Sequence, residues 1–142
     1  MHIHIPENIG SDLRLLPDGP VVATLELIIL GKSKAGKPKL TLKYIVTEDM
    51  ETLPEGEPTT VGETIIETVS LAENALFGLN NIYKAATGEQ LPQGDYSIEE
   101  FLEHLNETLT GRDWRLFVEG QVPSDGSSDK PRTTIIAREF IG

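Results

Sequence analysis

Two apolar runs joined by a short link constrain the fold of this chain most strongly. Residues 21–30 are rich in β-branched and aliphatic side chains, and residues 40–46 alternate large apolar side chains with mainly polar ones. The link between them contains Gly31, Gly36 and Pro38, which favour turns and oppose a helix. The sequence therefore predicts a β-hairpin, and with it a fold built on antiparallel strands.

The link and the second run also carry a local concentration of positive charge. Residues 31–47 contain no acidic residue and hold five of the twelve basic residues of the chain. The formal net charge of the chain is −11, and without these five lysines seven basic residues would face twenty-three acidic ones. The five are Lys32, Lys34, Lys37, Lys39 and Lys43.

Strand geometry should place part of this charge on one face of the hairpin. Because successive side chains of a strand point to opposite sides, Lys39 and Lys43 should lie together, opposite the apolar side chains. One side of the hairpin is therefore predicted to be a cationic strip. A lysine-rich hairpin also has a simpler interpretation, in which the charges only keep a strand edge soluble.

The remaining sequence predicts three more strands and two helices. Residues 48–60 are acidic and contain proline, which indicates a solvated loop. Ser70 with Glu73, and Ser97 with Glu100, have the spacing of a capping box, and each pair is followed by apolar residues at helical intervals. The further strands are expected at residues 61–69, 114–119 and 133–141.

This order of three strands, two helices and two strands predicts the fold class. It is the element order of an oligonucleotide-binding (OB) barrel, in which a helical insertion separates the third and fourth strands. A half-open antiparallel sheet with the helices at one end is the alternative. Both are mainly β with a helical insertion (α+β). With 38% hydrophobic residues, residues 1–142 can bury a core as a single domain, after an irregular leader over residues 1–19.

Binding of a single nucleic-acid strand needs flat side chains for base stacking as well as cations. On the last two predicted strands, Phe117 shares a face with Arg115, and Phe140 shares a face with Arg138, a mixed arrangement that suits bases. The alternative is that both phenylalanine rings are buried beneath the helices. Phe77 lies off the apolar face of the first helix. Four further aromatic residues lie on apolar faces and are expected in the core: Tyr44, Tyr83, Phe101 and Trp114.

Motifs for catalysis or metal binding are not apparent. The chain has no cysteine, no serine in a nucleophile elbow and no glycine-rich phosphate loop. Gly-Lys-Ser at residues 31–33 resembles the end of such a loop, but Glu26 stands where glycine is needed. His2 and His4 would share a strand face without a third ligand nearby, and His104 is expected to be structural. We therefore expect no enzyme activity, no metal and no cofactor.

The charge and hydropathy of the chain also narrow its partners. No run of about eighteen apolar residues and no signal peptide is visible, so neither membrane insertion nor secretion is expected. The absence of cysteine suits a reducing cytoplasm. A net charge of −11 opposes indiscriminate adhesion to polyanions. At physiological salt, however, the charges of the protein that lie more than about 8 Å from a bound phosphate are largely screened. A local cationic groove can therefore still bind a polyanion.

Four features occur in order along the chain: Leu-Pro-Asp-Gly at residues 16–19, the hairpin return at residues 36–44, the central helix at residues 76–86, and Leu-Thr-Gly-Arg at residues 109–112. Together, over about residues 17–142, they resemble a family of small bacteriophage proteins that are regarded as single-stranded-DNA-binding OB-fold proteins. The resemblance implies binding of single-stranded DNA with little sequence preference, during phage replication or recombination in the host cytoplasm.

These observations define a predicted interface and its partners. The predicted DNA contacts are the five lysines of the hairpin together with Arg115, Phe117, Arg138 and Phe140. The partners expected are single-stranded DNA and host or phage replication proteins, and a homodimer through an edge strand is a further option.

The rival hypothesis belongs to a different class of protein. Seven acidic residues lie between positions 48 and 67. In this interpretation the chain is an acidic protein-interaction or anti-defence module that docks on a basic host protein and does not bind DNA.

Overall fold

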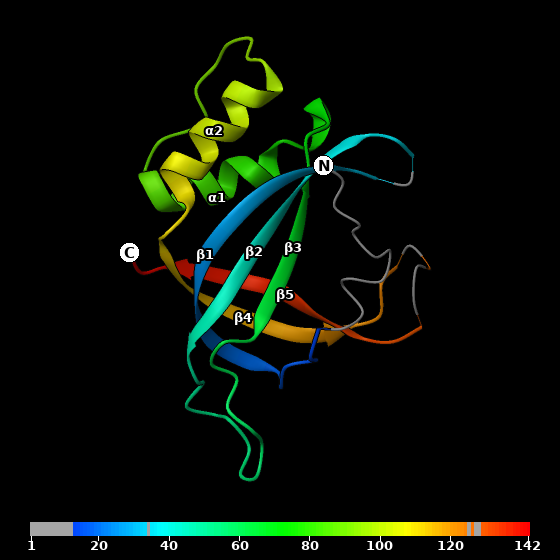
Figure 1. Ribbon diagram of the computed structural model, residues 1–142, viewed down its shortest axis with the longest axis vertical. Helices are drawn as coiled ribbons and strands as arrows, with labels where there is room; N and C mark the ends of the chain where they lie inside the picture. The colour runs from blue at the N-terminus through cyan, green and yellow to red at the C-terminus, as the bar shows by residue number, and fades with distance from the viewer. Residues whose placement is uncertain (1–12, 34, 125, 127–128) are drawn as a thin grey trace, which may run out of the picture.

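The chain folds around one antiparallel sheet with two helices near one end (Figure 1). A computed structural model describes residues 13–33, 35–124, 126 and 129–142. The strands are β1 (Gly19–Lys32), β2 (Pro38–Glu48), β3 (Thr64–Ser70), β4 (Asp113–Gln121) and β5 (Arg132–Phe140). A 3-10 turn, η1 (Glu73–Ala75), precedes α1 (Phe77–Thr87), and α2 (Ile98–Leu109) follows. The predicted order of three strands, two helices and two strands is confirmed.

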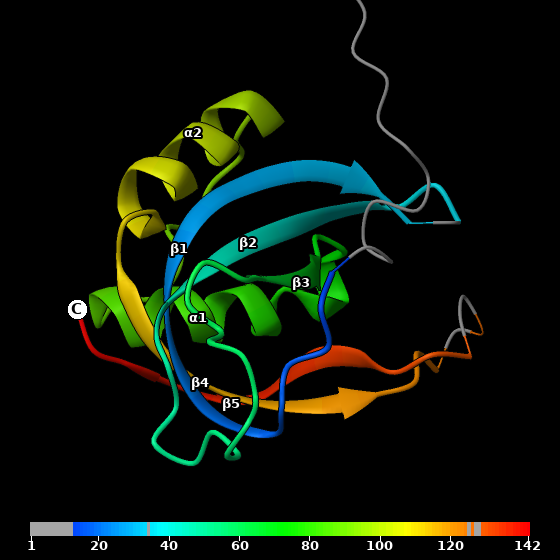
Figure 2. The same ribbon diagram turned by 60° about the horizontal axis from the view of Figure 1, so that its bottom comes forward.

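β1 occupies the centre of the sheet and bends along its length. The strand order is β3-β2-β1-β4-β5, and every neighbouring pair is antiparallel. Residues 19–24 of β1 pair with β4, whereas residues 22–32 pair with β2. The register with β2 shifts at residues 22–23 and 25–27, and such bulges bend a strand and increase its twist. Figure 2 shows the resulting curve, through which β1 belongs to both halves of the sheet.

The sheet does not close into a barrel. β3 and β5 are its two edge strands, and no ladder of hydrogen bonds joins them within the described part of the chain. The half-open antiparallel sheet is therefore the predicted alternative that the structure shows, and its strand order is compatible with an OB-like sheet. We call the gap between β3 and β5 the seam. α1 contacts both strands, so it spans one end of the seam.

A helix side chain takes the place of a strand beside the second half of β1. β4 pairs only with the first half of β1, so the backbone of Ile28 has no strand neighbour on that side. The Asn106 side chain of α2 accepts a hydrogen bond from Ile28 N–H (3.1 Å) and donates one to the Ile28 carbonyl (3.1 Å). This pair of bonds fixes α2 against β1 and satisfies buried backbone groups.

One of the two predicted capping boxes forms. The Ser97 side chain accepts a hydrogen bond from Glu100 N–H (3.2 Å) and starts α2 as expected. The prediction for Ser70 is wrong, because Ser70 pairs with Lys39 and is the last residue of β3. Its hydroxyl accepts from Ala72 N–H (3.0 Å), so the chain makes a turn and η1 before α1 begins.

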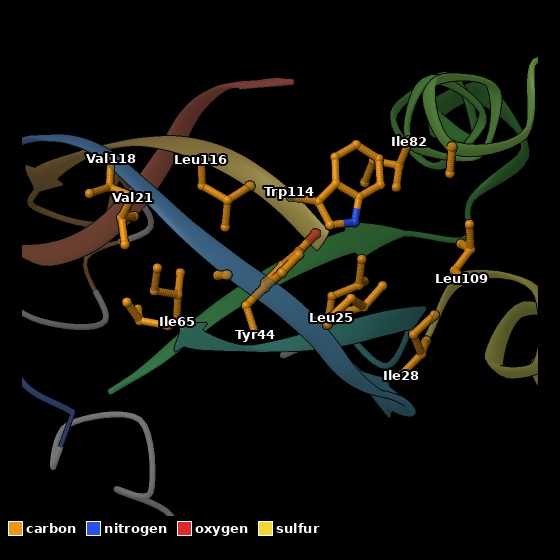
Figure 3. Close-up of a cluster of buried hydrophobic side chains, with 14 of the residues drawn as sticks. Val21, Leu25, Ile28, Tyr44, Ile65, Ile82, Leu109, Trp114, Leu116 and Val118 are labelled. Carbon is orange, nitrogen blue, oxygen red and sulfur yellow. The ribbon is translucent and has the colours of Figure 1, made fainter. Parts of the chain in front are cut away.

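The core fills the inner face of the curled sheet beneath the helices, and Figure 3 shows its central side chains. Alternate residues of β2 and β4 point inward, as the period of two in the sequence requires. The predicted core positions of Tyr44, Tyr83 and Trp114 are confirmed, and Phe101 packs against the core while partly buried. The fully buried aliphatic side chains include Leu25, Leu42, Ile65, Leu105, Leu109 and Leu116.

The described part of the leader packs against the sheet although it is irregular. Leu16 is buried, and its N–H donates to Thr133 Oγ1 at the start of β5 (3.0 Å). Asp18 accepts a hydrogen bond from Gly120 N–H of β4 (3.0 Å). The leader therefore ties both strands of the β4–β5 pair, and β1 begins at Gly19, the last residue of the predicted leader.

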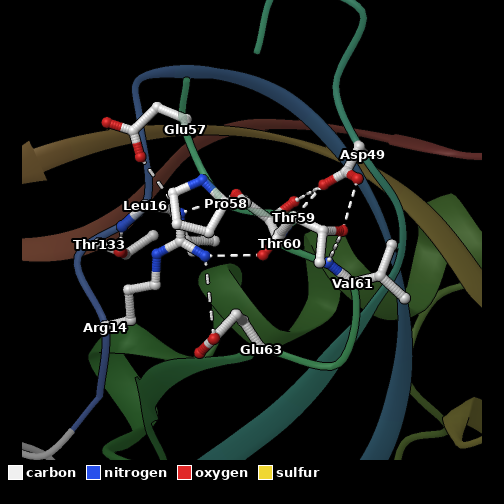
Figure 4. A network of polar contacts seen from close by, with 10 residues as sticks. All are labelled: Arg14, Leu16, Asp49, Glu57, Pro58, Thr59, Thr60, Val61, Glu63 and Thr133. Atoms are coloured by element: carbon white, nitrogen blue, oxygen red, sulfur yellow. Dashed lines mark hydrogen bonds and ion pairs between the residues drawn. The ribbon is translucent and has the colours of Figure 1, made fainter. Parts of the chain in front are cut away.

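The acidic loop between β2 and β3 is held in place rather than merely solvated (Figure 4). Arg14 donates to the carbonyls of Thr59 (2.7 Å) and Pro58 (3.0 Å). The Asp49 carboxylate accepts from the Thr59 hydroxyl (2.6 Å) and from both the N–H and the hydroxyl of Thr60 (2.6 Å each). Hydrogen bonds from Thr59 and then Thr60 lower the pKa of Asp49 below its ordinary value.

Candidate nucleic-acid interface

The tip of the β1–β2 hairpin is a hydrogen-bonded turn that projects lysines. Ser33 N–H donates to the Lys37 carbonyl (2.8 Å), and Gly36 N–H donates to the Ser33 carbonyl (2.8 Å). Gly36 has φ +79°, which a residue with a side chain rarely adopts, so the turn depends on glycine there. Lys32 and Lys37 are exposed on either side of this turn, and Lys34 lies outside the described residues.

Below the tip, the predicted cationic strip lies on the outer face of β2. Leu40, Leu42 and Tyr44 are buried, whereas Lys39 and Lys43 emerge on the opposite side. The Lys43 ammonium lies 3.8 Å from the Glu26 carboxylate, which the β1 bulge brings beside it. Lys43 is therefore partly neutralised.

Three lysines of the hairpin have no acidic partner among the described residues. Within the described chain no salt bridge involves Lys32, Lys37 or Lys39. The Lys39 side chain crosses the face of its β1 partner, because a Cβ added to Gly31 would lie 3.7 Å from Lys39 Cε. We call Lys32, Lys37 and Lys39 the lysine strip.

The surface beside the lysine strip combines hydroxyl and aliphatic groups. Ile29 of β1 pairs with Thr41 of β2, which in turn pairs with Thr68 of β3. Leu27 and Ile29 are exposed on this face. Ammonium and hydroxyl groups can donate hydrogen bonds to phosphate oxygens, and the aliphatic side chains can contact sugars and bases.

The structure does not bring Arg115 and Phe117 to the hairpin. Arg115 pairs in register with Val22, which lies roughly 30 Å from Lys32 along β1 at about 3.3 Å per residue. Arg115 forms an ion pair with Glu139 (3.2 Å). Arg115 and Phe117 instead line a separate cleft of about 310 Å³, shared with acidic residues of the β2–β3 loop that would repel a phosphate chain.

Arg138 and Phe140 face the core rather than a binding surface. The Arg138 guanidinium donates to the Tyr44 hydroxyl (2.9 Å), pairs with the Glu67 carboxylate, and lies 5.6 Å from the centre of the Trp114 ring. The Phe140 ring meets Trp114 edge-on, with centroids 5.1 Å apart. Of the two predicted alternatives for Phe140, packing inside the protein is therefore the one observed, and both residues have structural roles.

A bulge in β5 explains this reversal of faces. Phe117 pairs with Ala137 and Val118 pairs with Ile135, so Ile136 is an extra residue. Ile136 and Ala137 are both exposed, and the alternation of inward and outward side chains is inverted beyond them. As a result Ile135 and Arg138 both point inward.

The buried cluster around Tyr44 holds one end of the seam together. The Tyr44 hydroxyl donates to Glu67 of β3 (2.9 Å) and accepts from Arg138 of β5, so the cluster joins the two edge strands. Burial, followed by the nearby Glu67 carboxylate, raises the pKa of Tyr44 above its ordinary value. Tyr44 is therefore a neutral hydroxyl at neutral pH and can donate to Glu67.

The predicted interface did not include an exposed ring at the start of α1. Phe77 is the first residue of α1 and its exposed fraction is 70%. Leu71 N–H donates to the carbonyl of Pro38 (3.2 Å), the first residue of β2, which ties the segment before α1 to the turn end of the hairpin. Figures 1 and 2 both show η1 near that end of β1 and β2. The position of Phe77 off the apolar face of the helix was the signal in the sequence.

A metal site, a functional histidine and a membrane-spanning helix find little support among the described residues. Among the described residues, no group of three or more histidine, cysteine, aspartate or glutamate side chains could hold a metal ion. His2 and His4 lie outside those residues, and His104 Nε2 lies 2.9 Å from the Tyr83 hydroxyl as part of the packing between α1 and α2. Neither α1 nor α2, the helices of the described chain, has the length and apolar character needed to cross a membrane.

Comparison with models of known protein families finds no match, and comparison with curated proteins finds no similar sequence.

Proposed function

We propose that this protein binds single-stranded DNA, with little sequence preference, along the lysine strip of the β1–β2 hairpin. The observation that carries the proposal is the gathering of Lys32, Lys37 and Lys39 at and beside one hairpin turn without an acidic partner in the described chain, on a protein of net charge −11. On the strength of the sequence resemblance, we assign this activity to bacteriophage replication or recombination in the host cytoplasm.

The balance of charges supports contact at short range. At physiological salt the field of a distant exposed charge is screened within about 8 Å, so a phosphate at the hairpin responds mainly to the nearest ammonium groups. The acidic loop between β2 and β3 holds its carboxylates at the far end of β2, away from the hairpin tip (Figure 1). Lys43 contributes less than the other three because Glu26 competes for it.

The affinity for single-stranded DNA should fall with rising salt concentration by the amount expected for three phosphate contacts. Each contact on a single strand contributes about −0.7 to the slope of log affinity against log salt, so the lysine strip predicts a slope of about −2. Raising the salt from about 50 to about 200 mM should then weaken binding about 16-fold. Fluorescence anisotropy with a labelled oligothymidylate measures this directly, with the matching duplex as the control. A slope near zero with retained binding would refute the phosphate contacts.

Phe77 should supply a stacking surface for one base. Stacking of a base on an exposed ring contributes about 1–3 kcal/mol, so Phe77→Ala should weaken oligothymidylate binding at least about fivefold. The slope against salt should stay the same, because no charge is removed. Tyr96→Ala is the matched control, since Tyr96 is also exposed but precedes α2. Equal effects of the two substitutions would remove Phe77 from the interface.

The rival proposal, an acidic interaction module, is favoured by one observation. Arg14 and Asp49 bond to Thr59 and Thr60 and so hold the backbone of the β2–β3 loop, whose acidic residues a basic protein could match. The anisotropy assay separates the two proposals. Absence of oligothymidylate binding at low salt would favour the interaction module.

A further inference from the structure

One side of the edge strand β3, facing the seam, has no strand partner in the described chain. Leu71 N–H bonds to Pro38 and the Glu63 carbonyl bonds to Val46 N–H, so odd-numbered residues from 63 to 71 direct their backbone groups toward β2. Because these directions alternate along a strand, Thr64, Ile66 and Thr68 direct theirs into the seam. No described strand pairs with that side of β3.

The seam is closed at one end and open at the other. α1 and the Arg138–Glu67 pair cross it near the ends of β3 and β5. Toward the beginnings of the two strands lie cavities of about 440 and 390 Å³. They have Ile66, Thr68, Arg132 and Thr133 in common, so together they form one trough along the seam.

The lining of the larger cavity is apolar and basic. Leu13, Leu15 and Ile65 line it, together with Arg14, Lys130 and Arg132, and no acidic side chain does. Arg14 is already bonded to the β2–β3 loop. The Arg132 guanidinium makes no ion pair with a described residue, so it is available to a carboxylate.

We propose that the open seam binds one extended peptide strand of a partner protein, with aliphatic side chains alternating with acidic ones. The partner backbone would pair with the free edge of β3 at Thr64, Ile66 and Thr68, as in other cases of strand addition to a sheet edge. Its aliphatic side chains would enter the trough, and a carboxylate would meet Arg132. This site is separate from the lysine strip and does not depend on DNA binding.

An end-blocked, fluorescein-labelled peptide of alternating valine and glutamate is the probe. The wild-type protein should bind it, and should bind neither the peptide with lysine in place of glutamate nor the one with a central proline. Arg132→Glu should weaken binding about tenfold, whereas Arg115→Glu, which changes an arginine on the outer face of β4, should not. Replacing all three residues of the lysine strip by alanine should leave peptide binding unchanged.

Backbone pairing is tested at Ile66. Its N–H points into the seam, so Ile66→Pro removes the donor without breaking a bond to β2 and should abolish peptide binding. Ile66→Val keeps the N–H and should bind normally. In the wild-type protein, peptide should shift the NMR amide signals of Thr64, Ile66 and Thr68, a result that does not depend on the folding of a variant.

Three outcomes would overturn the proposal. One is that neither the glutamate peptide nor its controls bind. Another is that Ile66→Pro binds as well as Ile66→Val and the seam amides do not shift. The third is that oligothymidylate displaces the peptide and Arg132→Glu weakens both ligands equally, which would assign the seam to nucleic acid instead.

Discussion

Replacing Arg138 by methionine is expected to lower the free energy of unfolding by about 2–4 kcal/mol. The Arg138 and Glu67 side chains are only 19% and 16% exposed, and they join the two edge strands of an unclosed sheet. Methionine keeps much of the packing on Trp114 but removes the charge. The Glu67 carboxylate would then be left mostly buried with only the Tyr44 hydroxyl as its partner.

Chemical denaturation with urea measures this loss, and two further variants identify its cause. Arg138→Met combined with Glu67→Gln should recover part of the stability, because glutamine can still accept from Tyr44 and leaves no buried charge. Arg115→Met should change stability by less than about 0.5 kcal/mol, since the Arg115–Glu139 pair is solvent-exposed. Equal losses for Arg138→Met and Arg115→Met would show that the buried pair has no special role.

Replacing the three lysines of the lysine strip by alanine should have the largest effect on the affinity for single-stranded DNA. At about 50 mM salt, counterion release contributes roughly 1.2 kcal/mol for each phosphate contact on a single strand. The triple change Lys32→Ala, Lys37→Ala and Lys39→Ala should therefore weaken oligothymidylate binding on the order of a hundredfold or more and bring the salt slope close to zero. Anisotropy titrations at several salt concentrations give both quantities.

A control must separate loss of the strip from a general increase in negative charge. Lys84 on α1 is exposed, Arg115 on β4 is partly exposed, and both lie away from the hairpin turn. Changing both to alanine should weaken binding less than about threefold. The thermal unfolding of the triple variant should match that of the wild type, because exposed lysines contribute little to stability. If the double and triple variants lose affinity in proportion to charge alone, the lysine strip is not a site.

Much of the fold was predictable because its signals are local. The hairpin follows from a glycine- and proline-containing link between two strand-forming runs, and the second helix follows from the Ser97 capping box. Ser70 carries the same spacing and fails, because pairing with Lys39 across the sheet outweighs a cap that contributes only about 1 kcal/mol. The choice between a closed barrel and an open sheet depends on contacts between β3 and β5, which no local pattern encodes.

The candidate site shows the same division between local and distant information. Lys39 and Lys43 were predicted on one face because β2 alternates without interruption. Arg138 was predicted on an outward face, and for Phe140 the sequence left an outward and a buried position open. One extra residue at Ile136 inverts the alternation of β5 and turns both side chains inward. The distance between Arg115 and the hairpin follows from strand register, which is a tertiary property.

The central place of β1 has a consequence for how the chain reaches its native state. Its partner β2 begins within a few residues of the end of β1, whereas β4 begins about eighty residues after that end, so the two sides of β1 pair over very different loop lengths. The first three strands and the helices can assemble early, during synthesis, yet the part of the inner face that packs on β4 and β5 stays uncovered until those strands arrive. A partly folded chain that still lacks β4 and β5 would expose aliphatic side chains and an open strand edge. Misassembly with a second copy is therefore most to be expected at this stage.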